Sequence, residues 1–246
     1  MKPEMDKHAS LAPTAGRRRK VVVTFATILL LYGCVAYLLM PRWWKGYVRR
    51  HPSIEDVPNI THTGAGIPGD PLNVALIGSE TQLKKAMLKA GWCPADPLTL
   101  RSCLEIADAT VLRRAYRDAP VSNLYLFGRK EDLAFEQPVG DNPRRRHHVR
   151  FWRTDKLDSD GRPFWIGSAT YDESVGFSHT TGQITHHIDP DVDAERDHLF
   201  SDLRLAGDLS EFYAEDNFHR VRSGRNGGGD PWHTDGRLFV GVLPPK

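Results

Sequence analysis

The chain has 246 residues, with 33 Lys and Arg against 31 Asp and Glu, and 40% of its residues are hydrophobic. This composition excludes collagen-like, disordered and disulfide-scaffold proteins. The charge is unevenly divided: residues 1–69 hold ten Lys and Arg against four Asp and Glu, whereas residues 70–246 hold 23 against 27. A net-negative main domain argues against nucleic acid as a partner, because binding phosphates needs a surplus of clustered Lys and Arg. Residues 70–246 are enough for one globular domain.

A basic N-terminal tail, residues 1–20, precedes 20 consecutive uncharged residues, Val21–Met40. A helix of that length spans about 30 Å, the hydrocarbon thickness of a bilayer, so we expect one transmembrane helix with the lipid bilayer as its partner. The flanking segments, Arg17–Lys20 and Pro41–Tyr47, supply basic and aromatic interfacial residues. Five basic side chains lie close before the segment and four close after it. This small excess favours a cytoplasmic N-terminus and an extracytoplasmic main domain.

Residues 41–69 contain four prolines and several glycines, which predicts a linker. The run Gly64–Gly69 has the spacing G-x-G-x-x-G. A dinucleotide-binding loop must follow a strand and open a helix. This run precedes the first expected strand and is followed by Pro71, so we reject it as a cofactor loop.

The main domain is expected to open with a buried strand at Leu72–Ile77. Ser79 and Gln82 have the spacing of a capping box, which predicts a helix that begins at Ser79 and ends at Gly91. A second helix is expected from Asp96 to about Tyr116. After Val121 the hydrophobic period changes to two, and five strands are expected at Leu124–Phe127, Leu133–Gln137, His147–Arg153, Phe164–Tyr171 and Gly182–Ile188.

Asp189-Pro190 predicts the start of a further helix whose core face carries Val192, Leu199 and Leu203. Strands are expected near Phe218–Arg222 and Leu238–Leu243. This order of elements predicts an α+β fold, with a mainly antiparallel sheet and about three packed helices, preceded by the transmembrane helix.

Three cysteines, Cys34, Cys93 and Cys103, are too few for a disulfide framework. Cys93 and Cys103 would pair only in an oxidising compartment, and a buried thiol at each position is the simpler expectation.

Histidines are the main functional signal, because eight of the eleven lie from His147 onward. On a strand, His187 and Asp189 would share one face, with His186 on the other. If His148 or His179 lies beside that face, the group would bind a divalent metal or act as an acid and base. His148, His179 and His187 are therefore the catalytic candidates, and His179, His187 and Asp189 the candidate metal ligands. Helix capping by Asp189 and a buried role for His186 are the structural alternatives, and we favour them.

A second cluster, Arg144–His148, is a basic patch within an acidic domain. Arg145, Arg146 and His148 are candidates for binding a phosphate or carboxylate. A solvated strand edge is the alternative, since runs of charge at an edge also prevent strand pairing.

Two further patterns have simple structural explanations. The acids at alternate positions from Asp189 to Asp197 resemble a calcium loop but lack its central glycine, and they suit the first turns of a helix. Gly227–Asp230 is expected to be a mobile hairpin loop.

Several long strings resemble the LssY C-terminal domain family: Ala119–Ser122, Leu124–Arg129, Asp132–Gln137, Pro143–Phe151 and His179–Asp191. The resemblance extends from about Gly69 to Val242. It implies association with the bacterial envelope, where such domains follow membrane modules, among them a lipid-phosphatase-like one. The resemblance implies no activity for the domain itself. The phosphatase signature motifs are absent from this sequence, so that activity is not transferred.

The sequence therefore favours a single-pass membrane protein whose domain binds an anionic envelope ligand or lipid head group. A hydrolase of phosphate or carboxylate esters, dependent on a divalent metal or on histidine, is the alternative. A scaffold that recruits a membrane enzyme is a third reading.

Overall fold

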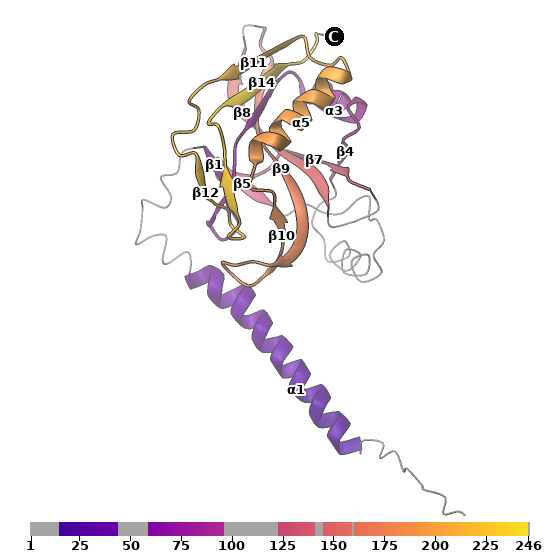
Figure 1. The fold of residues 1–246 in the computed structure, drawn as a ribbon, viewed down its shortest axis with the longest axis vertical. Coiled ribbons are helices and arrows are strands. Elements are labelled where there is room, and N and C mark those ends of the chain that lie inside the picture. Colours follow the sequence, from indigo (N-terminus) through magenta and orange to yellow (C-terminus); the bar gives the residue numbers. More distant parts are fainter. Residues whose placement is uncertain (1–14, 44–58, 96–122, 141–144, 159, 246) are drawn as a thin grey trace, which may run out of the picture.

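The computed structural model describes residues 15–43, 59–95, 123–140, 145–158 and 160–245 (Figure 1). Near the N-terminus, helix α1 (Ala15–Cys34) continues through a π-helical turn, η1 (Val35–Leu39), as far as Trp43. Within it, Arg19–Trp43 is long and apolar enough to cross a membrane. In Figure 1 this helix extends diagonally away from a domain built of sheets and two helices.

The domain is organised around an eight-stranded sheet. Its strand order is β11-β14-β3-β9-β8-β7-β4, and β10 pairs with residues 172–177 of β9, on the side of β9 opposite to β8. The β14–β3 pair is parallel, and the other pairs are antiparallel. The strands are β3 (Val74–Ile77), β4 (Cys93–Pro94), β7 (Leu133–Pro138), β8 (Arg146–Leu157), β9 (Pro163–Phe177), β10 (Ile184–Ile188), β11 (Glu211–Glu215) and β14 (Leu238–Val242).

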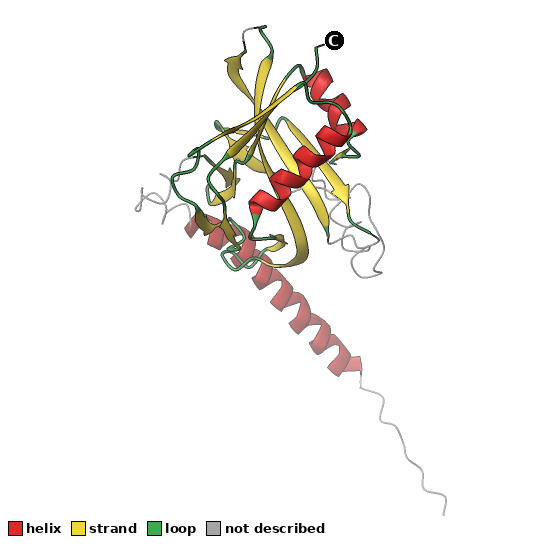
Figure 2. Ribbon diagram, turned by 45° about the horizontal axis from the view of Figure 1, so that its top comes forward, coloured by secondary structure: helices red, strands yellow, loops and turns green. Residues whose placement is uncertain are grey.

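Two helices, α3 (Glu80–Lys89) and α5 (Val192–Leu205), cover one face of this sheet (Figure 2). Helix α3 begins with the predicted capping box, in which Ser79 and Gln82 satisfy each other's backbone N–H groups. Leu83 of α3 and Leu203 of α5 are fully buried against the sheet. Burying a leucine in this way contributes roughly 1.5–3 kcal/mol.

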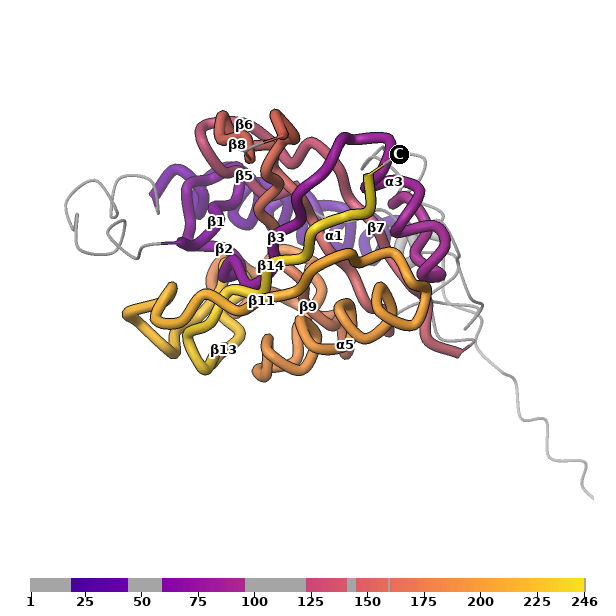
Figure 3. The backbone as a smooth tube through the Cα atoms, turned by 90° about the horizontal axis from the view of Figure 1, so that it is seen from above, coloured from indigo at the N-terminus to yellow at the C-terminus, as the bar shows by residue number. Residues whose placement is uncertain are grey.

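The opposite face of the large sheet is covered by a small four-stranded sheet of order β2-β1-β5-β6. Seen from above, α5 and the β5–β6 hairpin lie on opposite sides of β3 and β14 (Figure 3). The strands of the small sheet are β1 (Ile60–Thr63), β2 (Pro68–Pro71), β5 (Leu124–Leu126) and β6 (Arg129–Lys130). A separate hairpin joins β12 (Ser223–Arg225) to β13 (Pro231–His233).

The α+β class, the mainly antiparallel sheet and most predicted strands are confirmed. Several details differ. Residues 60–69, expected to be the end of the linker, instead form β1 and the start of β2, because β1 pairs with β5 of the domain. Phe218–Arg222 is not a strand; the strands of this region are β11, β12 and β13.

The start of α5 also differs from the prediction, because Asp191 caps it in place of Asp189. Cys93 is exposed rather than buried. The helix predicted at Asp96–Tyr116 and the thiol of Cys103 lie outside the described residues.

Candidate functional site

Strand β8 places a row of basic side chains inside the fold. Because alternate residues of a strand point to one face, Arg146, His148, Arg150 and Trp152 share the face that lies away from α3 and α5. Trp152 belongs to the apolar core on that face, and the three basic side chains beyond it are all buried. His147 points to the helix side, where it pairs with α5.

The buried basic row is paired with acids on the neighbouring strands. Arg146 lies directly opposite Asp172 of β9 and donates from Nε to Oδ2 at 3.1 Å. Its Nη1 lies 3.1 Å from Oε2 of Glu136 on β7. His148 Nδ1 is 3.1 Å from the same Asp172 oxygen, and Thr170 Oγ1 is 2.5 Å from His148 Nε2. The charges are therefore largely compensated within the sheet.

Arg150 fixes the tautomer of His148 and extends the network. Its Nη1 lies 3.1 Å from Nε2 of His148. Because arginine can only donate, Nε2 accepts, and we assign the hydrogen of His148 to Nδ1, from which it is donated to Asp172. Arg150 also lies 3.5 Å from Asp70 of β2, which accepts a hydrogen bond from Asn226 at 3.1 Å.

Burial and neighbouring charges set the protonation of this network in opposite ways. Burial acts to raise the pKa of Asp172, but His148, His186 and Arg146 more than offset it and hold that pKa well below its usual range. Burial is also the largest influence on His186, and it lowers the pKa from 6.5 to about 4, although Asp172 opposes it. At neutral pH Asp172 is therefore a carboxylate and His186 a neutral imidazole. Within the described ranges, the buried Oδ1 of Asp172 has no hydrogen-bond partner.

A cavity of about 520 Å³ lies over this network. Its polar floor includes Asp70, His148, Arg150, Asp172 and His186. Hydroxyl, phenol and amide side chains form much of its wall: Ser178, Thr181, Gln183, Thr185, Asn123, Tyr125 and Asn226. The rejected glycine-rich run forms the β1–β2 turn and also lines this cavity.

The apolar N-terminal helix completes the cavity wall with Tyr37 and Pro41. Its attachment to the domain is specific, because Tyr32 donates from its hydroxyl to the carbonyl of Gly182 at 2.7 Å. Gln183 in turn donates from Nε2 to the carbonyl of Ala36 at 3.0 Å. The cavity therefore opens beside the helix that could cross a membrane.

The tip of the β9–β10 ribbon, beside the same helix, is apolar. Phe177 and Ile184 pair across the two strands, and they are 64% and 62% exposed. The ring of Phe177 also makes an edge contact with that of Tyr32, with centroids 6.1 Å apart.

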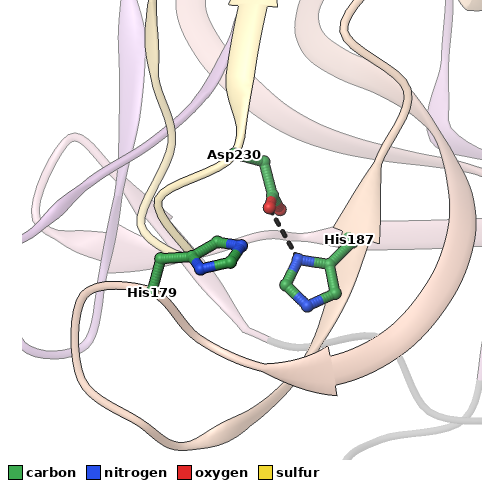
Figure 4. Close-up of side chains that lie close together, drawn as sticks. All are labelled: His179, His187 and Asp230. Atoms are coloured by element: carbon green, nitrogen blue, oxygen red, sulfur yellow. Dashed lines mark hydrogen bonds and ion pairs between the residues drawn. The ribbon is translucent and has the colours of Figure 1, made fainter.

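A second polar cluster lies outside the cavity lining and consists of His179, His187 and Asp230 (Figure 4). His187 Nδ1 is 2.6 Å from Oδ1 of Asp230, and the two imidazole centroids are 5.3 Å apart. Asp230 arrives on the β12–β13 loop, which is tied down because Asn226 Oδ1 accepts from the N–H groups of Gly228 and Asp230. The loop that we expected to be mobile is therefore held in place by its own hydrogen bonds.

The predicted site residues thus separate into three places. Arg145 is exposed at the start of β8, whereas Arg146 is a buried ion-pair partner and His148 lies in the cavity floor. The solvated strand edge is wrong for Arg146 and His148, because β8 lies between β7 and β9 and cross-strand acids hold both side chains inside. Binding of an anion by these three residues stays a prediction. His179 and His187 do come together.

Asp189 does not belong to the histidine cluster; its Oδ1 accepts from the N–H of Asp191 instead. A bulge in the β9–β10 pairing between His187 and Ile188 shifts the register there. Asp230, 43 residues further along the chain, takes the third place.

Sequence reasoning missed Asp70, Asp172 and Asn226 among the residues that line the cavity. Asp172 directly follows the expected strand Phe164–Tyr171, and only the longer observed strand, Pro163–Phe177, makes it a charged side chain within a buried β-strand, where it needs a partner. Asp70 lies between the expected linker and the first expected strand, and Asn226 lies between expected strands, so nothing local marked them.

The fold and the site define a class: an α+β domain attached to an apolar N-terminal helix, with a polar cavity between the two. The chain belongs to the family described as LssY C-terminus, whose family model matches residues 54–238. Comparisons with curated proteins and with solved structures gave no significant match.

Proposed function

We propose that this protein is a single-pass membrane protein of the bacterial envelope that binds the polar head group of an amphiphile. The lining of the cavity supports the proposal most directly, because Tyr37 and Pro41 of the apolar helix face the same space as Asp70, Arg150 and Asp172. An amphiphile lying along the helix would reach the polar floor with its head and keep its chains in lipid. The N-terminus is cytoplasmic and the domain extracytoplasmic, in keeping with the basic tail.

The charges of the lining favour a hydroxylated head group over a bare anion. Two carboxylates, Asp70 and Asp172, and one guanidinium, Arg150, face the cavity, and His186 is neutral at pH 7. Carboxylates accept hydrogen bonds and a guanidinium donates them. A hydroxyl group can donate to the carboxylates and accept from the guanidinium. An anion would instead be repelled by two carboxylates of its own charge.

The alternative hypothesis is that Arg145, Arg146 and His148 bind an anionic ligand. Arg146 already pairs with Asp172 and Glu136, so little of its charge remains for a ligand. A scaffold for a membrane enzyme would need no occupied cavity at all. Binding measurements distinguish a hydroxylated ligand, an anionic ligand and a scaffold without a ligand.

The test uses the full chain in phosphatidylcholine nanodiscs, titrated calorimetrically with a short-chain neutral glycolipid and, separately, a short-chain phosphatidate. Ala65 lines the cavity, so Ala65→Trp fills part of it; Lys130→Trp on the exposed part of β6 is the matched control. We expect saturable glycolipid binding that Ala65→Trp weakens at least about tenfold, a loss of about 1.4 kcal/mol, and that Lys130→Trp leaves unchanged.

Tighter binding of phosphatidate would favour the anionic version, and no binding of either lipid would reject the proposal. Thermal unfolding shows whether Ala65→Trp retains the fold. Thr185→Val, which removes one hydroxyl from the cavity wall, provides a smaller second change.

A hydrolase of phosphate or carboxylate esters is the second candidate function. One observation favours it: His187 and Asp230 form a short imidazole–carboxylate pair beside His179. Such a pair can orient a general base or complete a metal site. Release of product from p-nitrophenyl esters and phosphates, lost in His187→Ala, would support this activity.

A further inference from the structure

The cluster of His179, His187 and Asp230 is held by two packed segments on the side of the β9–β10 ribbon away from the cavity. His186 lines the cavity, and its neighbour His187 points to the other side, where it meets Asp230. The turn that carries His179 is joined to the β12–β13 loop, because His179 donates its backbone N–H to the carbonyl of Gly228 at 2.7 Å. The three side chains therefore have defined positions before any ligand binds.

Two glycines make room for the two imidazoles. A Cβ at Gly176 would lie 2.7 Å from Nε2 of His187, and a Cβ at Gly229 would lie 2.7 Å from Cβ of His179. Gly229 also has φ +88°, a left-handed conformation that other residues rarely adopt. The backbone can approach the ring of His187 and the Cβ of His179 this closely because neither glycine has a side chain.

The side chain of Asp230 is only 6% exposed. Its Oδ1 meets His187, and its Oδ2 accepts from the N–H of Ile188 at 3.4 Å. His187 is half-buried and His179 is exposed, so the cluster reaches from the interior to solvent. A buried carboxylate beside two imidazoles at a solvent-accessible edge is a common donor set for a transition metal.

We propose that His179, His187 and Asp230 bind one Zn²⁺ ion. One potential ligand atom from each residue lies within 4.8 Å of the others. Two atoms bound to a tetrahedral Zn²⁺ at about 2.1 Å are about 3.4 Å apart. The side chains must therefore move closer together on binding, and the exposed His179 side chain has room to turn. Two nitrogens and one oxygen leave the fourth tetrahedral position for water, an arrangement typical of catalytic rather than structural zinc.

The zinc site does not depend on what the cavity binds, because its three ligands lie outside the cavity lining. The two regions share the β12–β13 loop, in which Asn226 lines the cavity and Asp230 contributes the carboxylate. A metal ion would therefore stabilise one part of the cavity wall without contacting the ligand there.

The test uses the full chain in detergent, stripped with a chelator, dialysed and titrated with Zn²⁺ in competition with a chromophoric chelator. Asp230→Asn is the informative variant, since the amide keeps an oxygen acceptor for Ile188 and removes the charge. His187→Ala removes a ligand outright. His233→Ala is the matched control, because His233 is exposed on β13, three residues from Asp230, and lies outside the cluster.

We expect one equivalent of Zn²⁺ in the wild type and in His233→Ala, and affinity at least tenfold weaker in Asp230→Asn and in His187→Ala. Zn²⁺ should raise the Tm of the wild type and not that of the two ligand variants, since a ligand that binds only the folded state stabilises it. Co²⁺ should give the absorption of a tetrahedral site in the wild type and in His233→Ala, and not in the two ligand variants. Equal Zn²⁺ affinity in the wild type and Asp230→Asn, or no binding by the wild type, would overturn the proposal. The metal-free Tm of each variant shows whether it has folded.

Discussion

Arg146 and Asp172 face each other across the β8–β9 pair, and the guanidinium Nε lies 3.1 Å from Oδ2 of the carboxylate. Their side chains are 3% and 0% exposed, and Glu136 lies 3.1 Å from the same guanidinium. A charge buried this completely stabilises the fold only while its partners remain. Arg146 is therefore primarily a structural residue.

Replacing Arg146 should destabilise the protein far more than replacing its neighbour Arg145. Arg146→Met leaves the carboxylates of Asp172 and Glu136 without their cation, and breaking a buried ion pair in this way costs about 3–5 kcal/mol. Arg145 is exposed, so Arg145→Met should change stability by no more than about 0.5 kcal/mol. Thermal unfolding of the full chain in one detergent compares the two variants. Similar Tm values for both would mean that the buried pairs contribute little.

Stability should decrease below about pH 6.5, in part because of His219. His219 is buried and its Nε2 donates to the carbonyl of Leu72 at 2.6 Å. Burial lowers its pKa, although Leu72 and the charge of Asp193 oppose the shift. The unfolded chain therefore takes up a proton on this residue at a higher pH than the folded chain, and the free energy of unfolding falls as the pH falls.

His219→Gln keeps an N–H donor for Leu72 and removes the titrating group. We expect it to cost less than about 1.5 kcal/mol at pH 7.5 and to lose less stability than the wild type between pH 7.5 and 5. Denaturant unfolding across that range measures the difference. Parallel pH curves for the two proteins would show that His219 does not contribute.

The orientation in the membrane can be tested at Cys93, which is exposed on β4. A Cys34→Ser, Cys103→Ser variant retains Cys93 as its single thiol. With an extracytoplasmic domain, a membrane-impermeant maleimide should label this variant in intact spheroplasts about as strongly as after lysis. Labelling that requires lysis would place the domain in the cytoplasm.

The tip of the β9–β10 ribbon should contact lipid when the N-terminal helix spans a bilayer. Ile184 is 62% exposed beside that helix, whereas Leu205, at the end of α5, is 85% exposed on the helix-covered face. In a chain without its native cysteines, an environment-sensitive dye on Ile184→Cys should shift to the blue on transfer into nanodiscs. The same dye on Leu205→Cys should not. Equal shifts at both positions would argue against lipid contact at the tip.

Local sequence patterns were sufficient to predict the structure of a segment wherever that structure depends on the segment's own residues. The apolar run, the capping box at Ser79 and Gln82, and the buried face of α5 were all predicted correctly, because each depends on residues within about ten positions. The alternation that places His186 and His187 on opposite sides of β10 is equally local.

Prediction failed where partners come from distant segments. The burial of Arg146 depends on Glu136 and Asp172, which the chain places on different strands. Asp191 rather than Asp189 caps α5, although both aspartates suit a cap equally well on local grounds. Residues 60–71 form strands despite their prolines because β1 pairs with β5, more than 60 residues further on.

By itself, the sequence determined the apolar helix and the α+β class, and it named His179 and His187, which Figure 4 shows together, only as candidates. Only the tertiary structure decided that Asp230 completes this pair, and that Asp70, Asp172 and Arg150 form the floor of a cavity closed by Tyr37. The physical reason is that hydrophobic periodicity and capping act over one or two turns of chain. Partners for buried charges are selected only when strands far apart in the sequence come into register.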